Sequence, residues 1–340
     1  MKYSNIFDSH THSIHSFDGN HSCNALCDGA IEHGAIGIAI TDHCDIDMKD
    51  FEPENFAKVQ FADVTKTQTE YKDKLQVLHG IELGQGIFNK SLSEKILCDG
   101  AIEHGAIGIA ITDHCDIDMK DFEPENFAKV QFADVTKTQT EYKDKLQVLH
   151  GIELGQGIFN KSLSEKILSD YKYDFVLGSI HNLKGLDDFY FLDYKQYNIK
   201  QLLNQYFEAE LELAEWGNFD SLAHLTYPLR YIVAREHIDV DITEYYDVIE
   251  AIYKTLIKND KALELNVSGL FMDMKDTLPN KPLLTFYRDL GGKLITVGSD
   301  SHYCDKICRG IDRGYDILKD LGYGFFTIFE ARAPKLIEIK

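Results

Sequence analysis

Positive charge is scarce in this 340-residue chain. Its 35 Lys and Arg residues face 56 Asp and Glu residues, which gives a formal net charge of −21 at pH 7. Because proteins bind nucleic acids largely through Lys and Arg that neutralise phosphates, this balance disfavours a nucleic-acid partner. A small anionic substrate would instead need a local positive charge, such as bound metal ions.

Long apolar runs and a cysteine framework are also lacking. No stretch of 18 or more apolar residues occurs, and the amino-terminal sequence MKYSNIFDSHTH lacks the apolar segment of a signal peptide. Two of the seven cysteines recur in an internal repeat, and the spacing predicts no disulfide scaffold. We therefore expect a cytoplasmic globular protein with no membrane partner.

An internal repeat is the most conspicuous feature that is present. Residues 26–97 are identical to residues 97–168 at an offset of 71, so residues 27–97 are named the first copy and residues 98–168 the second copy. Repeat folds use three or more diverged units, whereas two undiverged copies indicate a recent duplication, an engineered sequence or an assembly error. Subtracting one copy leaves 269 residues, close to the roughly 250 of a single α/β barrel.

Within those 269 residues, short apolar segments rich in β-branched residues alternate with amphipathic ones, which is typical of βαβ units. The predicted strands are residues 5–9, 36–41, 76–82, 175–180, 221–224, 262–267 and 293–298. The predicted helices are residues 61–74, 197–215, 242–259 and 285–290, and residues 325–340 indicate a closing hairpin or edge element. No Pro-rich or Gly-rich linker divides the chain, so we expect one α/β domain over residues 1–340, a closed or nearly closed barrel.

Polar side chains gather where the predicted strands end. Six of the seven strands finish in a histidine or a carboxylate, namely Asp8-Ser9-His10-Thr11-His12, Asp42-His43, Glu82, His181, His224 and Asp300-Ser301-His302. Barrel enzymes build their active sites at the carboxyl ends of the strands. His10 and His12 also fall on the same side of their strand, which suits them to chelate a metal ion.

Each of these residues taken alone has a simpler explanation. His43 is typical of a solvated loop, and Glu82 and Asp300 fit helix caps or turns. Taken together, imidazoles and carboxylates that meet at one barrel mouth without a cation would leave costly unpaired buried charge. A polynuclear metal centre removes that cost, and mixed histidine and carboxylate ligands suit Zn, Fe or Mn better than Ca or Mg.

The ordered motifs resemble those of the PHP (polymerase and histidinol phosphatase) superfamily. They are H-x-H-[ST], a downstream S-x-D-G, TDH, G-[IV]-E, G-S-x-H, the lone histidine of the fifth strand and the final S-D-S-H. Within this superfamily, the length without one copy and the E-x-N-x-S-G segment at residues 264–269 are most similar to the histidinol-phosphate phosphatases.

The resemblance implies a distorted seven-stranded (β/α) barrel that holds three divalent metal ions, Zn, Fe or Mn. By motif, the ligands would be His10, His12, Asp18, His43, Glu82, His181, His224, Asp300 and His302, with His114 and Glu153 as the equivalents in the second copy. The implied reaction is hydrolysis of L-histidinol phosphate to L-histidinol and phosphate, in histidine biosynthesis, through a hydroxide that bridges metal ions. Asp300 and His302 would be catalytic, and either Asp300 or a metal-bound water would protonate the leaving alkoxide.

Phosphate oxygens that no metal holds need cationic partners. Arg230 is the first candidate because its guanidinium can contact two phosphoryl oxygens, and Lys184 is the next. An equally simple interpretation pairs Arg230 with an acidic neighbour. Two other functions stay open: a phosphatase for another phosphoester such as phosphotyrosine protein, and an inactive metal-binding protein whose barrel the repeat disrupts.

One barrel needs only one copy of the repeat. The chain offers three chemically equivalent ligand pairs, which are His43 with Glu82, His114 with Glu153, and His43 with Glu153. Extrusion of residues 98–168 would disturb the carboxyl ends of the strands least, so we expect the first copy to work and the second copy to be a poorly packed insert. Surplus strand edges also favour domain swapping, and the sequence leaves the oligomeric state open.

Overall fold

The computed structural model describes residues 6–11, 21–33, 35–43, 53–82, 97–102, 105–118, 122–301 and 307–340. They fall into two compact units, Met1–Lys90 and Ser91–Lys340. The single domain expected over residues 1–340 stays a prediction. In the described residues, each copy of the repeat contributes to an apolar core of its own.

The smaller unit is a three-stranded parallel sheet with two helices. Its elements are β1 (Ile6–Thr11), α1 (Cys23–Glu32), β2 (Ala35–His43), α2 (Pro53–Tyr71) and β3 (Gln76–Glu82), and the strand order is β1-β2-β3. The hydroxyl of Ser22 caps α1 by accepting a hydrogen bond from the backbone N–H of Ala25. The buried core comprises Cys23, Cys27, Ile38, Val64, Tyr71 and Leu75.

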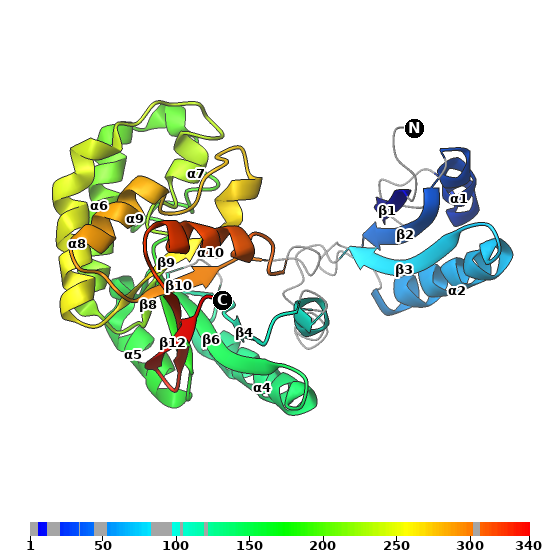
Figure 1. The fold of residues 1–340 in the computed structure, drawn as a ribbon, viewed down its shortest axis with the longest axis horizontal. Helices are drawn as coiled ribbons and strands as arrows, with labels where there is room; N and C mark the ends of the chain where they lie inside the picture. The colour runs from blue at the N-terminus through cyan, green and yellow to red at the C-terminus, as the bar shows by residue number, and fades with distance from the viewer. Residues whose placement is uncertain are drawn as a thin grey trace. The chain divides into compact units, whose positions relative to one another are not determined.

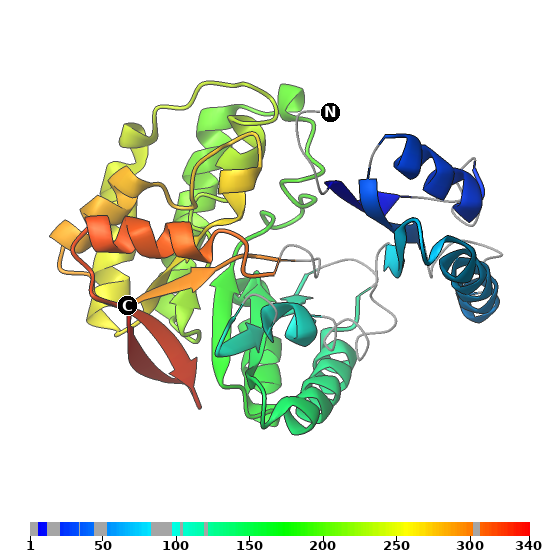
Figure 2. The ribbon, with the colours of Figure 1, turned by 45° about the vertical axis from the view of Figure 1, so that its right-hand side comes forward.

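The larger unit is built on a parallel sheet whose strand order is β10-β9-β8-β7-β6-β4, with β5 also paired to β6. Its strands are β4 (Gly108–Ile111), β5 (His114–Asp116), β6 (Gln147–Gly155), β7 (Phe175–Ser179), β8 (Ser221–Leu222), β9 (Ala262–Asn266) and β10 (Ile295–Gly298). Its helices are α4 (Pro124–Tyr142), α5 (Lys161–Asp170), α6 (Ile199–Trp216), α7 (Leu229–Ile232), α8 (Tyr246–Lys258), α9 (Lys281–Asp289) and α10 (Ile311–Asp320), and short 3₁₀ turns are η1 (Gly157–Asn160), η2 (Tyr194–Gln196), η3 (Ile242–Tyr245) and η4 (Ser268–Phe271). Figures 1 and 2 show the helices on the outside of the strands, as the α/β pattern predicts.

Burial explains why these strands form. Every residue of β7 and β9 is buried, which is the pattern of parallel strands covered on both faces. The largest fully buried side chains of the unit are Tyr206, Tyr253, Tyr287, Phe189, Phe207 and Phe219. Helix α6 supplies several core residues, and it ends where Gly217 adopts the left-handed backbone conformation, with a φ of 66°. Among the described residues, no helix is long and apolar enough to cross a membrane.

The second copy of the repeat is part of this sheet, whereas from the sequence we expected residues 98–168 to be a poorly packed insert. Strand β6 pairs with β7 along Gly151–Gly155, and α4 buries Ala128, Val135 and Tyr142 beneath the neighbouring strands. The reason is connectivity. The second copy leads through α5 directly into β7, so the pairing needs no extruded segment between them.

Identical residues adopt slightly different structures in the two copies. Helices α2 and α4 have matching bounds at the repeat offset, whereas the nine residues of β2 correspond to the shorter strands β4 and β5. Strand β2 pairs with β1 on one side and β3 on the other, while β4 ends the strand order of the larger sheet. The neighbouring strand therefore changes the backbone that the same sequence forms.

The larger unit ends in a carboxyl-terminal hairpin that packs against β7, in agreement with the predicted closing hairpin. It consists of β11 (Phe325–Glu330) and β12 (Ala333–Glu338), which pair antiparallel. Phe329 stacks on Phe175 of β7 with ring centroids 5.6 Å apart. Next to the turn, Arg332 donates to the buried carboxylate of Asp220 at 2.5 Å. The hairpin is thus fixed by an apolar and an ionic contact.

Candidate metal centre

Four side chains meet at the carboxyl ends of neighbouring strands in the larger unit. His114 begins β5, Glu153 lies near the end of β6, and His181 and His224 follow β7 and β8 by two residues each. Parallel pairing places these strand ends side by side, with His114 directly opposite Glu153 in the register. The sequence predicted this convergence from the polar residues that follow apolar strands.

The carboxylate of Glu153 lies at the centre of the group. Its Oε1 is 2.9 Å from Nε2 of His181 and 3.0 Å from Nε2 of His224, and its Oε2 is 3.7 Å from Nε2 of His114. The two Nε2 atoms of His181 and His224 are themselves 3.3 Å apart. Glu153, His181 and His224 are at most 5% exposed.

This donor set fits a divalent metal ion. Three of the residues, His114, Glu153 and His181, offer ligand atoms that all lie within 4.8 Å of one another. Imidazole nitrogens and a carboxylate oxygen that face each other in a buried site are the ligands that Zn, Fe and Mn use in proteins. The convergence of these donor atoms is the observation that favours a metal over a merely structural cluster.

The ionisable groups of the cluster shift one another's pKa values. Burial alone would raise the pKa of Glu153, but His114 and His181 hold it well below its usual range. Burial alone would lower the pKa of His181, but the carboxylates of Asp116 and Glu153 raise it well above its usual range. Burial lowers the pKa of His224 despite the neighbouring Glu153. The site therefore favours an ionised carboxylate beside one neutral imidazole.

Within the larger unit, the pair that lies beside His181 comes from the second copy, His114 and Glu153, whereas we had expected His43 and Glu82, a pair that stays a prediction. Glu153 occupies the place beside His181 and His224, because its strand β6 pairs with β7. His43 and Glu82 end β2 and β3 in the smaller unit, where the backbone alone is described.

The other predicted ligands and phosphate-binding residues have different outcomes. His10 lies in β1 of the smaller unit, again described by its backbone, and His12, Asp18 and His302 lie outside the described residues. Lys184 is exposed in the segment after β7. These assignments remain predictions.

A second polar group surrounds Asp300, after β10. Its Oδ2 accepts hydrogen bonds from Nη2 of Arg230 at 3.0 Å, Nδ2 of Asn266 at 3.2 Å and Oγ of Ser268 at 3.3 Å. Arg230 also donates to Ser268 at 2.8 Å. The alternative interpretation of Arg230, an ion pair with an acidic neighbour, is thus what the structure contains, although the arginine side chain is only 10% exposed.

Asn266 and a buried glutamate connect this group to the histidines. Oε2 of Glu264 accepts from the backbone N–H of His224 at 2.8 Å and from the Asn266 amide at 3.3 Å. Burial raises the pKa of Glu264 to about 8. In the sequence, the E-x-N-x-S-G segment was notable only for its resemblance to the family motif. In the structure, Glu264 of this segment holds the backbone of His224, and Asn266 and Ser268 donate to Asp300.

Sequence reasoning missed two residues that touch the histidines. Tyr227 packs its ring 5.1 Å from that of His181 and 4.9 Å from that of His224, and its hydroxyl donates to Asp188. Asp116 places Oδ1 2.9 Å from Nδ1 of His181. Asp116 carried a signal, since it follows the TDH motif by two residues at the end of a strand, whereas Tyr227 has an ordinary apolar sequence context.

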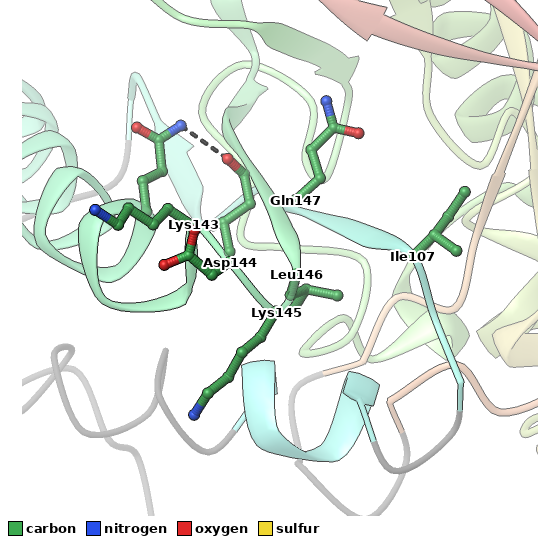
Figure 3. A pocket seen from close by; sticks show the side chains of 8 residues that line it. Ile107, Lys143, Asp144, Lys145, Leu146 and Gln147 are labelled. Carbon is green, nitrogen blue, oxygen red and sulfur yellow. Dashed lines mark hydrogen bonds between the residues drawn. The ribbon is translucent and has the colours of Figure 1, made fainter.

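A pocket of about 450 Å³ lies elsewhere in the larger unit (Figure 3). It is lined by Ile107, Gln139, Lys143, Asp144, Lys145, Leu146, Gln147 and Val148. Gln147 begins β6, so the pocket lies at the amino-terminal end of a strand whose other end carries Glu153. Catalytic sites of α/β barrels lie at the carboxyl ends of strands, so this pocket does not compete with the histidine cluster as the active site.

Glu210, fully buried on α6, gives the unit a testable pH dependence. Burial raises the pKa of its carboxyl to about 8 from an ordinary 4.5, so the folded chain keeps a proton there that the unfolded chain releases. The stability that this provides is complete below pH 4.5 and is lost as the pH rises through 8. We expect Glu210 to contribute a fall of about 5 kcal/mol in the free energy of unfolding across this window, and Glu210→Gln to remove that contribution and make the dependence on pH shallower.

Urea unfolding of the wild type and of Glu210→Gln at several pH values between 5 and 8 measures this effect. Glu208 is exposed on the same helix, so Glu208→Gln is the matched control and should keep the slope of the wild type. An unchanged slope in Glu210→Gln would show that Glu210 is ionised in the folded protein.

Taken together, the parallel α/β sheet and the histidine and carboxylate cluster at its strand ends are the arrangement of a metal-binding α/β protein. A family model, the PHP domain, matches residues 8–97 and 90–268, and the chain belongs to this family. One match contains the first copy of the repeat and the other contains the second copy.

Its relatives include histidinol-phosphatases. The chain is 33% identical over 225 residues to the probable histidinol-phosphatase of Clostridium acetobutylicum, a match that covers 64% of this chain and 84% of the relative. It is 28% identical to the histidinol-phosphatase of Lactococcus lactis, covering 67% of this chain and 85% of that protein. It is also 32% identical to the probable histidinol-phosphatase of Thermotoga maritima, covering 55% and 82%.

One solved structure is similar across the chain. It is the histidinol phosphate phosphatase of Lactococcus lactis, complexed with zinc, L-histidinol and phosphate. The TM-score is 0.52 at 19% sequence identity, and the match covers 97% of this chain and 98% of the other. At this identity the likeness is one of fold.

Proposed function

We propose that the chain is a metal-dependent phosphomonoesterase that hydrolyses L-histidinol phosphate to L-histidinol and phosphate. The observation that carries this proposal is the buried convergence of His114, Glu153, His181 and His224 at the strand ends. The relatives named histidinol-phosphatases support the choice of substrate, and the bound zinc, L-histidinol and phosphate of the similar structure support the choice of chemistry.

The second copy is our proposed source of the ligands from the repeat. His114, Glu153, His181 and His224 would hold metal, and Asp300 would join them, as the motif resemblance implies. His10, His12, Asp18 and His302 remain the predicted ligands, and they would complete a set of three Zn, Fe or Mn ions in a seven-stranded barrel that includes β1. When bound, such ions polarise phosphoryl oxygens and supply hydroxide near neutral pH.

Protein side chains would bind and orient the rest of the substrate. Arg230 is our proposed phosphate ligand, because its buried Nε has no hydrogen-bond partner in the described part of the chain and so remains available to a phosphoryl oxygen. Lys184, exposed after β7, is the second candidate. Asp300, held beside Arg230 at 3.0 Å, is our candidate to accept the proton of the attacking water and to pass it to the leaving alkoxide.

A substrate panel tests the proposal. Purified protein loaded with Zn, Fe or Mn is assayed for phosphate release from L-histidinol phosphate, phosphotyrosine peptides and simple phosphomonoesters, and kcat/KM values are compared. We expect L-histidinol phosphate to rank first. A higher kcat/KM for phosphotyrosine peptides would assign the site to another phosphoester, and no hydrolysis of any of them would favour an inactive metal-binding protein.

A further inference from the structure

We infer that Asp116 is a positioning residue that fixes the imidazole of His181 for metal binding. This inference rests on the proposed metal-dependent function and deepens it. Asp116 is outside the set of ligands that the motifs imply, and its equivalent in the first copy is Asp45. The argument rests on contacts within the larger unit.

The two ring nitrogens of His181 have different partners. Nδ1 lies 2.9 Å from Oδ1 of Asp116, while Nε2 faces Glu153 Oε1 at 2.9 Å and His224 Nε2 at 3.3 Å. A carboxylate can only accept, so the contact at Nδ1 requires an N–H on that nitrogen. In the metal-free ring, the contact with Glu153 requires a second N–H on Nε2. A metal ion would take the place of that second proton, because Asp116 keeps the first on Nδ1 and Nε2 points into the cluster of ligand atoms.

Asp116 is itself held in place. It is 7% exposed, and it lies opposite Gly155 in the register of β5 and β6. A Cβ atom at position 155 would overlap Oδ1 of Asp116, so glycine leaves the space that the carboxylate fills. Buried packing of this kind fixes the direction from which the carboxylate approaches the histidine.

Gln156 gives a second support. Its backbone is in the left-handed region with a φ of 52°, and its side chain is 1% exposed. With the amide nitrogen turned toward Asp116, it donates to Oδ1 at 2.8 Å, and the amide oxygen accepts from the backbone N–H of His181 at 3.3 Å. One buried amide thus contacts both the carboxylate and the residue that the carboxylate orients.

Such an arrangement strengthens a histidine ligand in two ways. It selects the tautomer and ring orientation that present Nε2, and the negative charge raises the basicity of that nitrogen. Loss of such a partner typically costs about 10- to 100-fold in metal affinity. A carboxylate buried only for packing would leave the affinity unchanged.

The experiment compares the same change in the two copies. Full-length wild type, Asp116→Ala, Asp116→Asn and Asp45→Ala are titrated with Zn²⁺ against a competing chelator, and Co²⁺-loaded samples are compared by visible absorption. We expect Asp116→Ala to weaken the tightest Zn²⁺ binding by about 10- to 100-fold and to shift the Co²⁺ bands. Asp116→Asn should recover part of the loss because its amide oxygen accepts the same Nδ1–H bond, and Asp45→Ala should match the wild type.

Two results would overturn the inference. One is wild-type Zn²⁺ affinity and Co²⁺ bands in Asp116→Ala, and the other is the same loss in Asp45→Ala. If the alanine variant does not fold, the nearly isosteric Asp116→Asn decides by the same two measurements. Because metal is measured without substrate, a wild type that binds Zn²⁺ but hydrolyses no phosphoester would refute the proposed function while leaving this inference intact.

Discussion

Glu153→Gln is expected to lower kcat for L-histidinol phosphate by about a thousand-fold, which corresponds to about 4 kcal/mol of activation free energy. The carboxylate is 5% exposed and contacts His181 and His224 within 3.0 Å, so its loss removes the central anionic donor of the cluster. The measurement is steady-state kinetics with metal content determined on the same samples.

The repeat supplies a matched control for this variant. Glu82 occupies the equivalent position of the first copy, in an identical sequence context, and Glu82→Gln is expected to change kcat by no more than about twofold. A large loss in Glu82→Gln with normal activity in Glu153→Gln would assign the working ligand to the first copy. Large losses in both variants would mean that both copies contribute to activity.

Removal of one copy is expected to raise both metal content and activity. Deleting residues 27–97 or residues 98–168 gives the same 269-residue chain, so one protein tests the effect of the surplus copy. We expect this shorter chain to bind three metal ions and the full chain to bind fewer. We expect kcat/KM to rise by about tenfold or more, since each ion of a polynuclear site stabilises the transition state.

The physical reason lies in strand β1, which carries His10. In the structure β1 pairs with β2 of the first copy, for example Ile6 opposite Ala35. The second copy offers the same residues in β4, which ends the strand order of the larger sheet. The chain has one β1, and two segments of identical sequence, β2 and β4, that could pair with it. Deletion of one copy leaves only one such segment.

Metal analysis, kinetics and size-exclusion chromatography of the two chains check this expectation. Chromatography detects dimers that form when two chains exchange strands. Such an exchange could complete the metal site with residues of a second chain and so change the metal content. Three ions per full-length chain together with an unchanged kcat/KM would show that the surplus copy does not compete for β1. Loss of activity in the shorter chain would show that the second set of repeat residues is required.

Much of the fold follows from sequence pattern. The predicted strands 175–180 and 262–267 correspond to β7 and β9, and the predicted helix 197–215 corresponds to α6. Apolar runs and 3.6-residue periodicity are local properties, so they predict elements without knowledge of the partners. The predicted helix 61–74 began too late, because Pro53 can open a helix and the polar first turns of α2 weaken the periodic signal.

The residues of the candidate site likewise fall into those that the sequence predicted and those that it missed. His181 and His224 were predicted because each is a polar residue directly after an apolar strand, and the structure brings them 3.3 Å apart at their Nε2 atoms. Tyr227 was missed because its contact with the histidine rings joins residues that no local pattern connects. Asp116 had a signal in its place at a strand end, but nothing in the sequence identified His181 as its partner. Arg230 was proposed for phosphate, but its partner Asp300 lies 70 positions further along the chain.

The sequence by itself determined the family motifs, the α/β pattern and the residue types of the site. It had no means to choose between the two copies, because identical residues have identical propensities and offer identical ligands. Only the tertiary structure shows how the second copy joins the larger sheet. Strand β6 leads through α5 into β7, so Glu153 of the second copy meets His181 and His224.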